Sequence, residues 1–226
     1  MAAVGILALS HALLLYPVLR PNVQWLGPVV THFETPRREV WLTIDDGPTE
    51  DTPAVLDLFD AHGVQATFFV KGELAESHPH LAAEILRRGH SLANHSQTHP
   101  AGSFWCSPPR RLANEIDGCN RAISALTGQP ARWFRAPVGM KNPAVHPTLD
   151  RRGMRLIGWT ARGFDAVRSD PEEVLSRILP HIRSGAIIVL HQGREHSLRV
   201  LEHVIVALGE RGYSFVIPED EQLRAA

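Results

Sequence analysis

The chain has 226 residues, a formal net charge of −1 at pH 7 and 13 histidines. This length suffices for one large domain with a full hydrophobic core, or for a domain with an appendage. The balanced charge argues against nucleic acid as a partner, because proteins that bind phosphate backbones usually carry a basic face or tail. The abundant histidines indicate metal or proton chemistry, or simply surface usage.

The N-terminal segment is apolar. Residues 2–19, AAVGILALSHALLLYPVL, carry no charge, and Arg20 and Pro21 end the run. Its length is at the lower limit for a membrane span, and it lacks the basic start and the small-residue cleavage site of a secretory signal. Two interpretations stay open, membrane association and a helix packed on the domain. The first favours a membrane-associated or cell-envelope location over a cytoplasmic one.

The two cysteines, Cys106 and Cys119, form no Cys-x-x-Cys pair. They indicate neither a zinc finger nor a disulfide scaffold. A single disulfide and two free thiols both remain compatible with the sequence.

After a polar link, Thr31 to Arg38, apolar runs alternate with amphipathic stretches. The predicted helices include Pro53–His62, Pro79–Arg88 and His196–Arg211, each followed by a glycine. Several strands are continuous apolar runs such as AIIVL, which is typical of a parallel sheet covered on both faces. The alternation predicts one α/β domain over residues 39–226, a barrel or a doubly wound sheet, after an N-terminal segment and linker over 1–38. The predicted strands are Val40–Ile44, Ala66–Val70, His90–Ala93, Ala131–Arg135, Arg155–Trp159, Ala186–Leu190 and Tyr213–Ile217.

Reactive side chains follow five of these seven predicted strands. In parallel α/β folds the active site lies at the carboxyl ends of the strands. Scattered surface usage would not place acid–base and ligand-type residues so regularly. In chain order these residues are Asp45, Asp46, His95, His99, Arg135, Asp165 and His191.

Two of these histidines have the spacing of a metal site. His95 and His99 are four residues apart and would face the same way in one helical turn. With one carboxylate from another strand end they provide three ligands and leave positions open for water and substrate. Asp45 and Asp46 cannot easily both bind one ion through one short turn, so we expect one ligand and one free base. The cation would offset the repulsion between the two carboxylates.

Four motifs occur in order along the chain, LTIDDGP, HSQTH, RAPVG and IVLH. They resemble the signature motifs of the polysaccharide deacetylase family (carbohydrate esterase family four, the NodB homology domain), and ATFFVKG and GHSLANHSQTHP match as well. The similarity runs from about Glu39 to Ile217. It implies a distorted (β/α)7 barrel and a hydrolase that removes N-acetyl or O-acetyl groups from sugars with a bound divalent metal.

The resemblance also implies how the metal and the base are arranged. Asp46, His95 and His99 would hold the metal, most simply zinc, although cobalt, manganese or iron also suit such ligands. Asp45 would be the general base that activates water. Arg135 would pair with Asp45 and keep it oriented and ionised.

The same resemblance assigns the acid side of the reaction. His191 would be the general acid that protonates the leaving amine. Asp165 would sit behind His191, fix its tautomer and raise its pKa. The metal and a backbone N–H near Val138 would hold the oxyanion, and Pro137 would belong to the same oxyanion and substrate region.

The chain departs from the family pattern around the predicted pocket. The fourth motif usually reads Asp-x-x-Asp-Trp, and here the stretch is RGFDA, with Arg162 for the first Asp and Ala166 for the Trp. The third motif often carries an aromatic residue where this chain has Val138. We expect a wider, less aromatic pocket unless another aromatic residue compensates. The candidates for this are Trp105, Trp133 and Phe164.

Arg162 suggests a substrate. A guanidinium binds phosphate through two hydrogen bonds, so Arg162 at the mouth of a wide pocket would suit an anionic or lipid-linked amino sugar better than neutral chitin. Two alternatives to an N-deacetylase stay open. One is a relative that cleaves another C–N bond, such as a formyl amide, and the other is a catalytically silent carbohydrate-binding domain. The second alternative predicts loss of a base, an acid or a ligand, and none is lost.

Overall fold

The computed structural model describes residues 13 and 15–225, and their centre is a curled sheet of ten strands. The strand order is β10-β1-β8-β2-β3-β4-β5-β6, while β7 pairs with β8 and β9 with β2. This is the α/β barrel-like architecture that the sequence predicts, in distorted form. The strands are β1 Val30–Phe33, β2 Glu39–Asp45, β3 Ala66–Val70, β4 Ser91–Asn94, β5 Trp133–Phe134, β6 Arg155–Leu156, β7 Ala161–Arg162, β8 Ala186–His191, β9 Ser214–Phe215 and β10 Leu223–Ala225.

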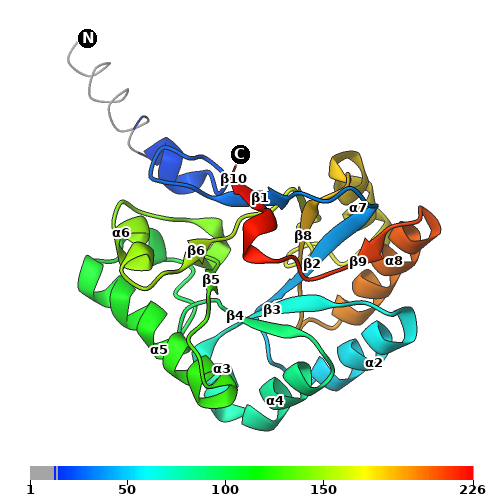
Figure 1. Ribbon diagram of the computed structural model, residues 1–226, viewed down its shortest axis with the longest axis horizontal. Helices are drawn as coiled ribbons and strands as arrows, with labels where there is room; N and C mark the ends of the chain where they lie inside the picture. The colour runs from blue at the N-terminus through cyan, green and yellow to red at the C-terminus, as the bar shows by residue number, and fades with distance from the viewer. Residues whose placement is uncertain (1–12, 14, 226) are drawn as a thin grey trace.

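The helices lie outside the curl and cover it on most sides (Figure 1). The predicted helix stops are confirmed, because Gly63, Gly89 and Gly212 all adopt positive φ just beyond a helix. The α-helices are α2 Thr52–His62, α3 Gly72–Ser77, α4 Pro79–Arg87, α5 Pro109–Thr127, α6 Val145–Asp150, α7 Pro171–Ile178 and α8 Ser197–Glu210.

The strands are buried on both faces, which explains their continuous apolar runs. Leu42 and Phe68 belong to the large core between the sheet and the helices. Trp41 and Phe69, one residue away on each strand, belong to a smaller cluster inside the curl. Side chains alternate along a strand, so Thr43 and Asp45 share the inner face with Trp41. The inner face of β2 therefore becomes polar toward its carboxyl end.

The register brings reactive residues from distant parts of the chain together. β2 and β8 are parallel, and Asp45 pairs directly with His191. β2 is also parallel to β3, with Asp45 opposite Phe69. Because parallel strands end at the same edge, the side chains that follow them meet at one end of the curl.

The strand predicted at Arg155–Trp159 is shorter than expected. β6 pairs with β5, and the chain then leaves this partner. The N–H of Gly158 donates to the Val30 carbonyl, and the N–H of Thr160 donates to the Ile187 carbonyl. β7 then pairs with β8, so residues 155–162 cross from one side of the sheet to the other and curl it back toward β8.

The predicted link at Thr31–Arg38 is wrong in part, because it overlaps β1. β1 pairs antiparallel with β10 and β8 and lies within the sheet. This strand is short and mixes polar with apolar residues, which hid it in the sequence. The division of the chain at residue 38 stays a prediction.

The apolar segment over residues 2–19 lies mostly outside the described residues. Within residues 13 and 15–225, no helix is long and apolar enough to span a bilayer.

Candidate active site

A pocket of about 400 Å³ opens at the carboxyl ends of the parallel strands. Residues at the ends of the strands β2–β8 and in the loops that follow them meet there. The residues predicted to bind metal, act as base and act as acid all line this pocket. Its lining consists of Asp45, Asp46, Lys71, His95, His99, Ala101, Val138, Gly139, Trp159, Arg162, Ala166, Val167, Val189, His191 and Arg194.

Asp46, His95 and His99 form a cluster that could hold a metal ion. One ligand atom from each lies within 4.8 Å of the other two. The two imidazole centroids are 4.7 Å apart, and His99 Nε2 lies 3.7 Å from Asp46 Oδ1. These separations are compatible with three ligands around one ion.

The protonation of this cluster also fits a metal. His95 Nδ1 lies 2.9 Å from the Arg135 carbonyl, so this nitrogen donates its hydrogen and Nε2 keeps a free lone pair toward the pocket. Asp46 Oδ1 is buried and accepts no hydrogen bond from the described residues. A buried carboxylate oxygen without a donor is costly unless a cation faces it.

Burial lowers the pKa of His95, and burial together with the charge of His95 lowers the pKa of His99 to about 4. Burial alone would raise the pKa of Asp46, but the nearby charges of His95 and Lys71 outweigh it and bring the value to about 2. At neutral pH the cluster therefore presents two neutral imidazoles and one carboxylate. This is the form that a divalent metal requires.

The two histidines meet through a loop and not, as predicted, through a helical turn. His95 follows β4 directly, and its N–H donates to the Val70 carbonyl. His99 has φ of 51° and its N–H donates to Ser96 Oγ. Glu115 of α5 holds the loop between them by accepting hydrogen bonds from the N–H and Oγ1 of Thr98. Tertiary contacts thus replace the helix that the spacing suggested.

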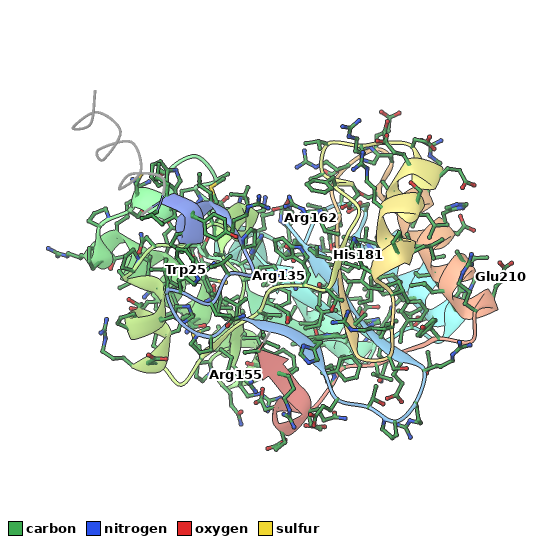
Figure 2. The ribbon with its side chains drawn as sticks, turned by 90° about the horizontal axis from the view of Figure 1, so that it is seen from above. Trp25, Arg135, Arg155, Arg162, His181 and Glu210 are labelled. Carbon is green, nitrogen blue, oxygen red and sulfur yellow. The ribbon has the colours of Figure 1, made fainter. Side chains whose placement is uncertain are left out.

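Asp45 is held by a buried arginine. Arg135 Nη1 donates to Asp45 Oδ1 at 2.7 Å and to Thr43 Oγ1 at 2.8 Å, and Nη2 donates to the Gly158 carbonyl. The guanidinium also stacks 4.1 Å from the centroid of the Phe69 ring, near the centre of the fold (Figure 2). Asp45 Oδ2 is left facing the pocket, 3.6 Å from His95 Nε2.

Asp165 clamps His191 at two points. Asp165 Oδ2 accepts the His191 backbone N–H at 2.7 Å, and Oδ1 lies 3.0 Å from His191 Nδ1. Burial acts to lower the pKa of His191, but the hydrogen bond and charge of Asp165, helped by Asp45 and Asp46, raise it above its usual value. The hydrogen bond fixes a proton on Nδ1 and leaves Nε2 as the atom that can exchange a proton in the pocket.

Val138 lies on the pocket wall in a short 3-10 turn, Pro137–Gly139. Its φ of 50° is unusual for a β-branched residue. The N–H groups of Gly139 and Met140 bond to the carbonyls of Ala136 and Pro137. Pro137 is buried and has no backbone N–H. The first backbone N–H group in this turn is therefore that of Val138.

Trp159 supplies an aromatic wall that the sequence did not predict. It lines the pocket, and the Arg162 guanidinium lies 5.1 Å from its ring centroid. The Arg162 guanidinium also lies 4.5 Å from the Phe164 ring centroid. None of the three residues considered as replacements lines this pocket. Phe164 lies beside Arg162, Trp133 packs on Trp41 inside the curl, and Trp105 donates to the carbonyl of Gly102.

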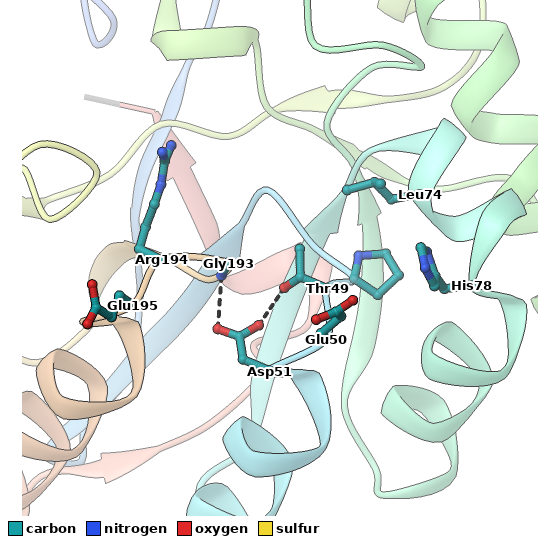
Figure 3. A pocket seen from close by; sticks show the side chains of 9 residues that line it. Thr49, Glu50, Asp51, Leu74, His78, Gly193, Arg194 and Glu195 are labelled. Carbon is teal, nitrogen blue, oxygen red and sulfur yellow. Dashed lines mark hydrogen bonds between the residues drawn. The ribbon is translucent and has the colours of Figure 1, made fainter.

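Lys71 and Arg194 were also missed. Lys71 Nζ lies 3.4 Å from Asp46 Oδ1, and Arg194 lies 3.8 Å from Asp46 Oδ2. Lys71 comes directly after β3 and Arg194 lies in the loop after β8, so the strand-end rule could have found them. Figure 3 shows Arg194 beside a neighbouring pocket, where Asp51 accepts a hydrogen bond from the N–H of Gly193 and ties the loop after β8 to the loop after β2.

The two cysteines are free thiols, so the predicted alternative of a disulfide is wrong. Cys106 is exposed, whereas Cys119 is buried in α5 and its Sγ donates to the Val70 carbonyl.

Known proteins resemble this chain over most of its length. The polysaccharide deacetylase family model matches residues 32–157. A chitooligosaccharide deacetylase of Bradyrhizobium sp. (strain ANU 289) is 35% identical over 192 residues, which cover 78% of this chain and 87% of the relative. A peptidoglycan-N-acetylglucosamine deacetylase of Bacillus cereus is 29% identical over 205 residues, covering 88% and 95%.

Solved structures agree with these matches. A CE4 family pseudoenzyme from Bacillus anthracis superposes with a TM-score of 0.74 at 30% identity, covering 82% of this chain and 65% of that one. A peptidoglycan N-acetylglucosamine deacetylase crystallised with an N-hydroxybenzamide compound gives 0.74 at 27% identity, covering 82% and 88%. The motifs, the fold and the matched sequences have one explanation: this chain belongs to the polysaccharide deacetylase family.

Proposed function

We propose that this protein is a metal-dependent hydrolase that removes an N-acetyl group from an amino sugar or a polysaccharide built from it. Two relatives are named for deacetylation of chitooligosaccharide and of peptidoglycan, which supports a carbohydrate substrate. One solved relative is a pseudoenzyme, so activity must be argued from this chain's own residues. The observation that carries the proposal is the joint placement, in one pocket, of a three-ligand cluster, a free carboxylate and a clamped histidine.

Asp46 Oδ1, His95 Nε2 and His99 Nε2 would hold the metal. Their chemistry suits zinc, and cobalt, manganese and iron accept the same ligands. A divalent ion bound there would supply Lewis acidity, which lowers the pKa of water and polarises the acyl oxygen.

Asp45 would act as the general base. One of its oxygens is occupied by Arg135, so the carboxylate has a fixed orientation. The other oxygen, Oδ2, faces the pocket beside His95 Nε2 and would take the proton from the attacking water. Arg135 is too deeply buried to touch substrate, so we assign it a positioning role.

His191 would act as the general acid. Its raised pKa keeps a larger fraction protonated near neutral pH, and Asp165 holds the ring so that Nε2 faces the pocket. The proton on Nε2 would go to the amine nitrogen as the C–N bond breaks. The N–H of Val138 would stabilise the negative charge that develops on the acyl oxygen.

The test combines metal content with product release. Purified wild type, His95→Ala and Asp46→Ala would be assayed for bound metal, and for acetate and formate released from N-acetylated and N-formylated glucosamine oligomers. His62→Ala, an exposed histidine on α2, is the matched control. We expect near-stoichiometric metal and acetate release in wild type and control, and loss of both in the two site variants.

Metal retained by both site variants would mean that the ion lies elsewhere. Bound metal without any acyl release would favour a carbohydrate-binding domain. Release of formate alone would reassign the enzyme to deformylation, a reaction that needs the same groups.

A further inference from the structure

A second pocket adjoins the candidate active site and is not used by the chemistry proposed above. It has a volume of about 450 Å³ and shares two wall residues with the first pocket, Trp159 and Arg162. The two cavities are therefore neighbours across these side chains. The remaining lining residues are Tyr16, Arg20, Pro21, Asn22, Val23, Thr160, Phe164 and His181.

The ionisable side chains that line this second pocket are basic, apart from the tyrosine. Its described lining includes the guanidinium groups of Arg20 and Arg162 and the imidazole of His181, and it includes no carboxylate. Arg162 and His181 are labelled in Figure 2, where they lie close to each other. Neither arginine has a carboxylate partner within 4.0 Å among the described residues, although seventeen ion pairs occur elsewhere in them. Unpaired guanidinium groups in a hollow attract anions.

Arg162 lies against aromatic rings and has no carboxylate within 4.0 Å among the described residues. Its guanidinium carbon is 5.1 Å from the Trp159 ring centroid and 4.5 Å from that of Phe164, while the charges of Asp165 and Asp45 act on it from farther away. Such cation–π contacts restrict the guanidinium and leave its N–H groups free for a ligand. Burial lowers the pKa of Arg162 only from a very high starting value, so the group stays charged.

Residues 20–22, which form another part of the pocket wall, are hydrogen-bonded to the rest of the domain. The buried Lys141 ammonium donates at 2.8 Å to the carbonyls of both Arg20 and Pro21. Asn22 Nδ2 donates to the Trp159 carbonyl at 2.8 Å. These contacts join residues more than a hundred positions apart and give the pocket a second fixed side. The hollow is therefore built by the fold and is not a chance gap beside a loose segment.

From these contacts we infer that the second pocket is a subsite for a phosphate group carried by the amino-sugar substrate, with Arg162 and Arg20 as its recognition residues. The inference rests on the proposed function, because it places the N-acyl group in the first pocket and the phosphate in the second. A planar guanidinium matches phosphate oxygens through paired N–H donors. The aromatic walls suit a sugar face or an apolar chain attached to the same phosphate.

The test compares two substrates that differ at one position. Methyl N-acetyl-α-glucosaminide is neutral, whereas N-acetylglucosamine 1-phosphate carries phosphate on the same anomeric oxygen. We expect the wild type to show a higher kcat/KM for the phosphate. Arg162→Gln should lower the ratio of the two kcat/KM values about tenfold, which corresponds to about 1.4 kcal/mol. Arg20→Gln should lower the same ratio by a smaller factor, because Arg20 is exposed.

Arg110→Gln is the matched control. It removes one exposed arginine on α5 that lines neither pocket, and the ratio should stay at the wild-type value. Binding of N-acetylglucosamine 1-phosphate to the metal-loaded Asp45→Asn protein, with and without Arg162→Gln, gives a second readout that needs no turnover. The dissociation constant should rise about tenfold when Arg162 is replaced.

The possible failures are distinguishable. Acetate release from the neutral sugar without preference for the phosphate, or a ratio unchanged by both arginine variants, would overturn the subsite and leave the proposed function standing. No release from either sugar or from the N-acetylated oligomers would contradict the proposed function, and the binding experiment would then decide the subsite alone. A butyl phosphodiester of the same sugar distinguishes a terminal phosphate from a phosphate that links the sugar to a longer chain. Preference for the diester over the monoester would indicate the linking phosphate.

Discussion

The two contacts between Asp165 and His191 lead to a measurable prediction about how activity depends on pH. Replacing Asp165 by asparagine removes the negative charge but keeps the size of the side chain. The amide oxygen can still accept the backbone N–H of His191, whose bond to Asp165 Oδ2 is 2.7 Å long. The NH2 group then faces Nδ1, which stabilises the neutral imidazole with its proton on Nε2.

The size of the effect follows from the contact that is lost. Both side chains are largely buried, with exposed fractions of 12% for His191 and 3% for Asp165, so solvent screens their interaction little. A hydrogen bond between charged groups stabilises by about 1.5–3 kcal/mol, and one pKa unit corresponds to about 1.4 kcal/mol. We therefore expect Asp165→Asn to lower the pKa of His191 by roughly 1–2 units.

The assay is the pH profile of kcat/KM for acetate release. A general acid works while protonated, so activity is present below the pKa of His191 and is lost as pH rises through it. In wild type this pKa is raised, and in Asp165→Asn the basic limb should move to lower pH. Asp51→Asn is the matched control, because Asp51 also binds a backbone N–H, that of Gly193, without touching the histidine ring. An unmoved basic limb in Asp165→Asn, or an equal movement in the control, would refute this assignment of the acid.

Three further predictions concern stability and metal binding. Arg135→Met leaves a buried carboxylate unpaired and should lower the free energy of unfolding by about 3–5 kcal/mol in urea titrations, whereas Arg132→Met, at an exposed ion pair, should cost less than about 1 kcal/mol; equal losses would contradict the burial argument. Zinc at about a hundred times its dissociation constant should stabilise wild type by about 2.7 kcal/mol in thermal unfolding, and a similar gain in His95→Ala would show that the ion binds elsewhere. Lys141→Met frees the Arg20 and Pro21 carbonyls, so chymotrypsin should cut after Trp25 faster, and an unchanged rate would mean that other contacts hold this segment.

The strand-end residues could be predicted from the sequence because parallel strands impose a common edge. Once β2, β4 and β8 are recognised as parallel strands of one sheet, the residues that follow them must converge. This places Asp45, His95 and His191 together without knowledge of any side-chain contact. The helix stops at glycine were equally predictable, since they depend on local backbone preference.

Other features depend on contacts that local sequence does not encode. β1 and β7 are short, and their partners lie far along the chain in β10 and β8. The turn that joins His95 to His99 needs Glu115 from α5, nearly twenty residues away. Trp159 was assigned to a strand, yet the chain bends away from its partner there and exposes the ring to two pockets. Each of these is set by long-range packing, where propensity is a weak guide.

The adjacent carboxylates show how one backbone angle separates two chemical roles. In a regular strand, successive side chains point to opposite faces, so Asp45 would face the inside of the curl and Asp46 the helices. Asp46 instead has φ of 77°, and both carboxylates line the same pocket. The left-handed conformation costs about 1–2 kcal/mol in an ordinary residue and less in aspartate. It lets Arg135 hold one carboxylate while the other faces His99 and Lys71. Strain of this kind persists where the surroundings enforce it, and here it gives neighbouring residues the two positions that the proposed base and the proposed metal ligand require.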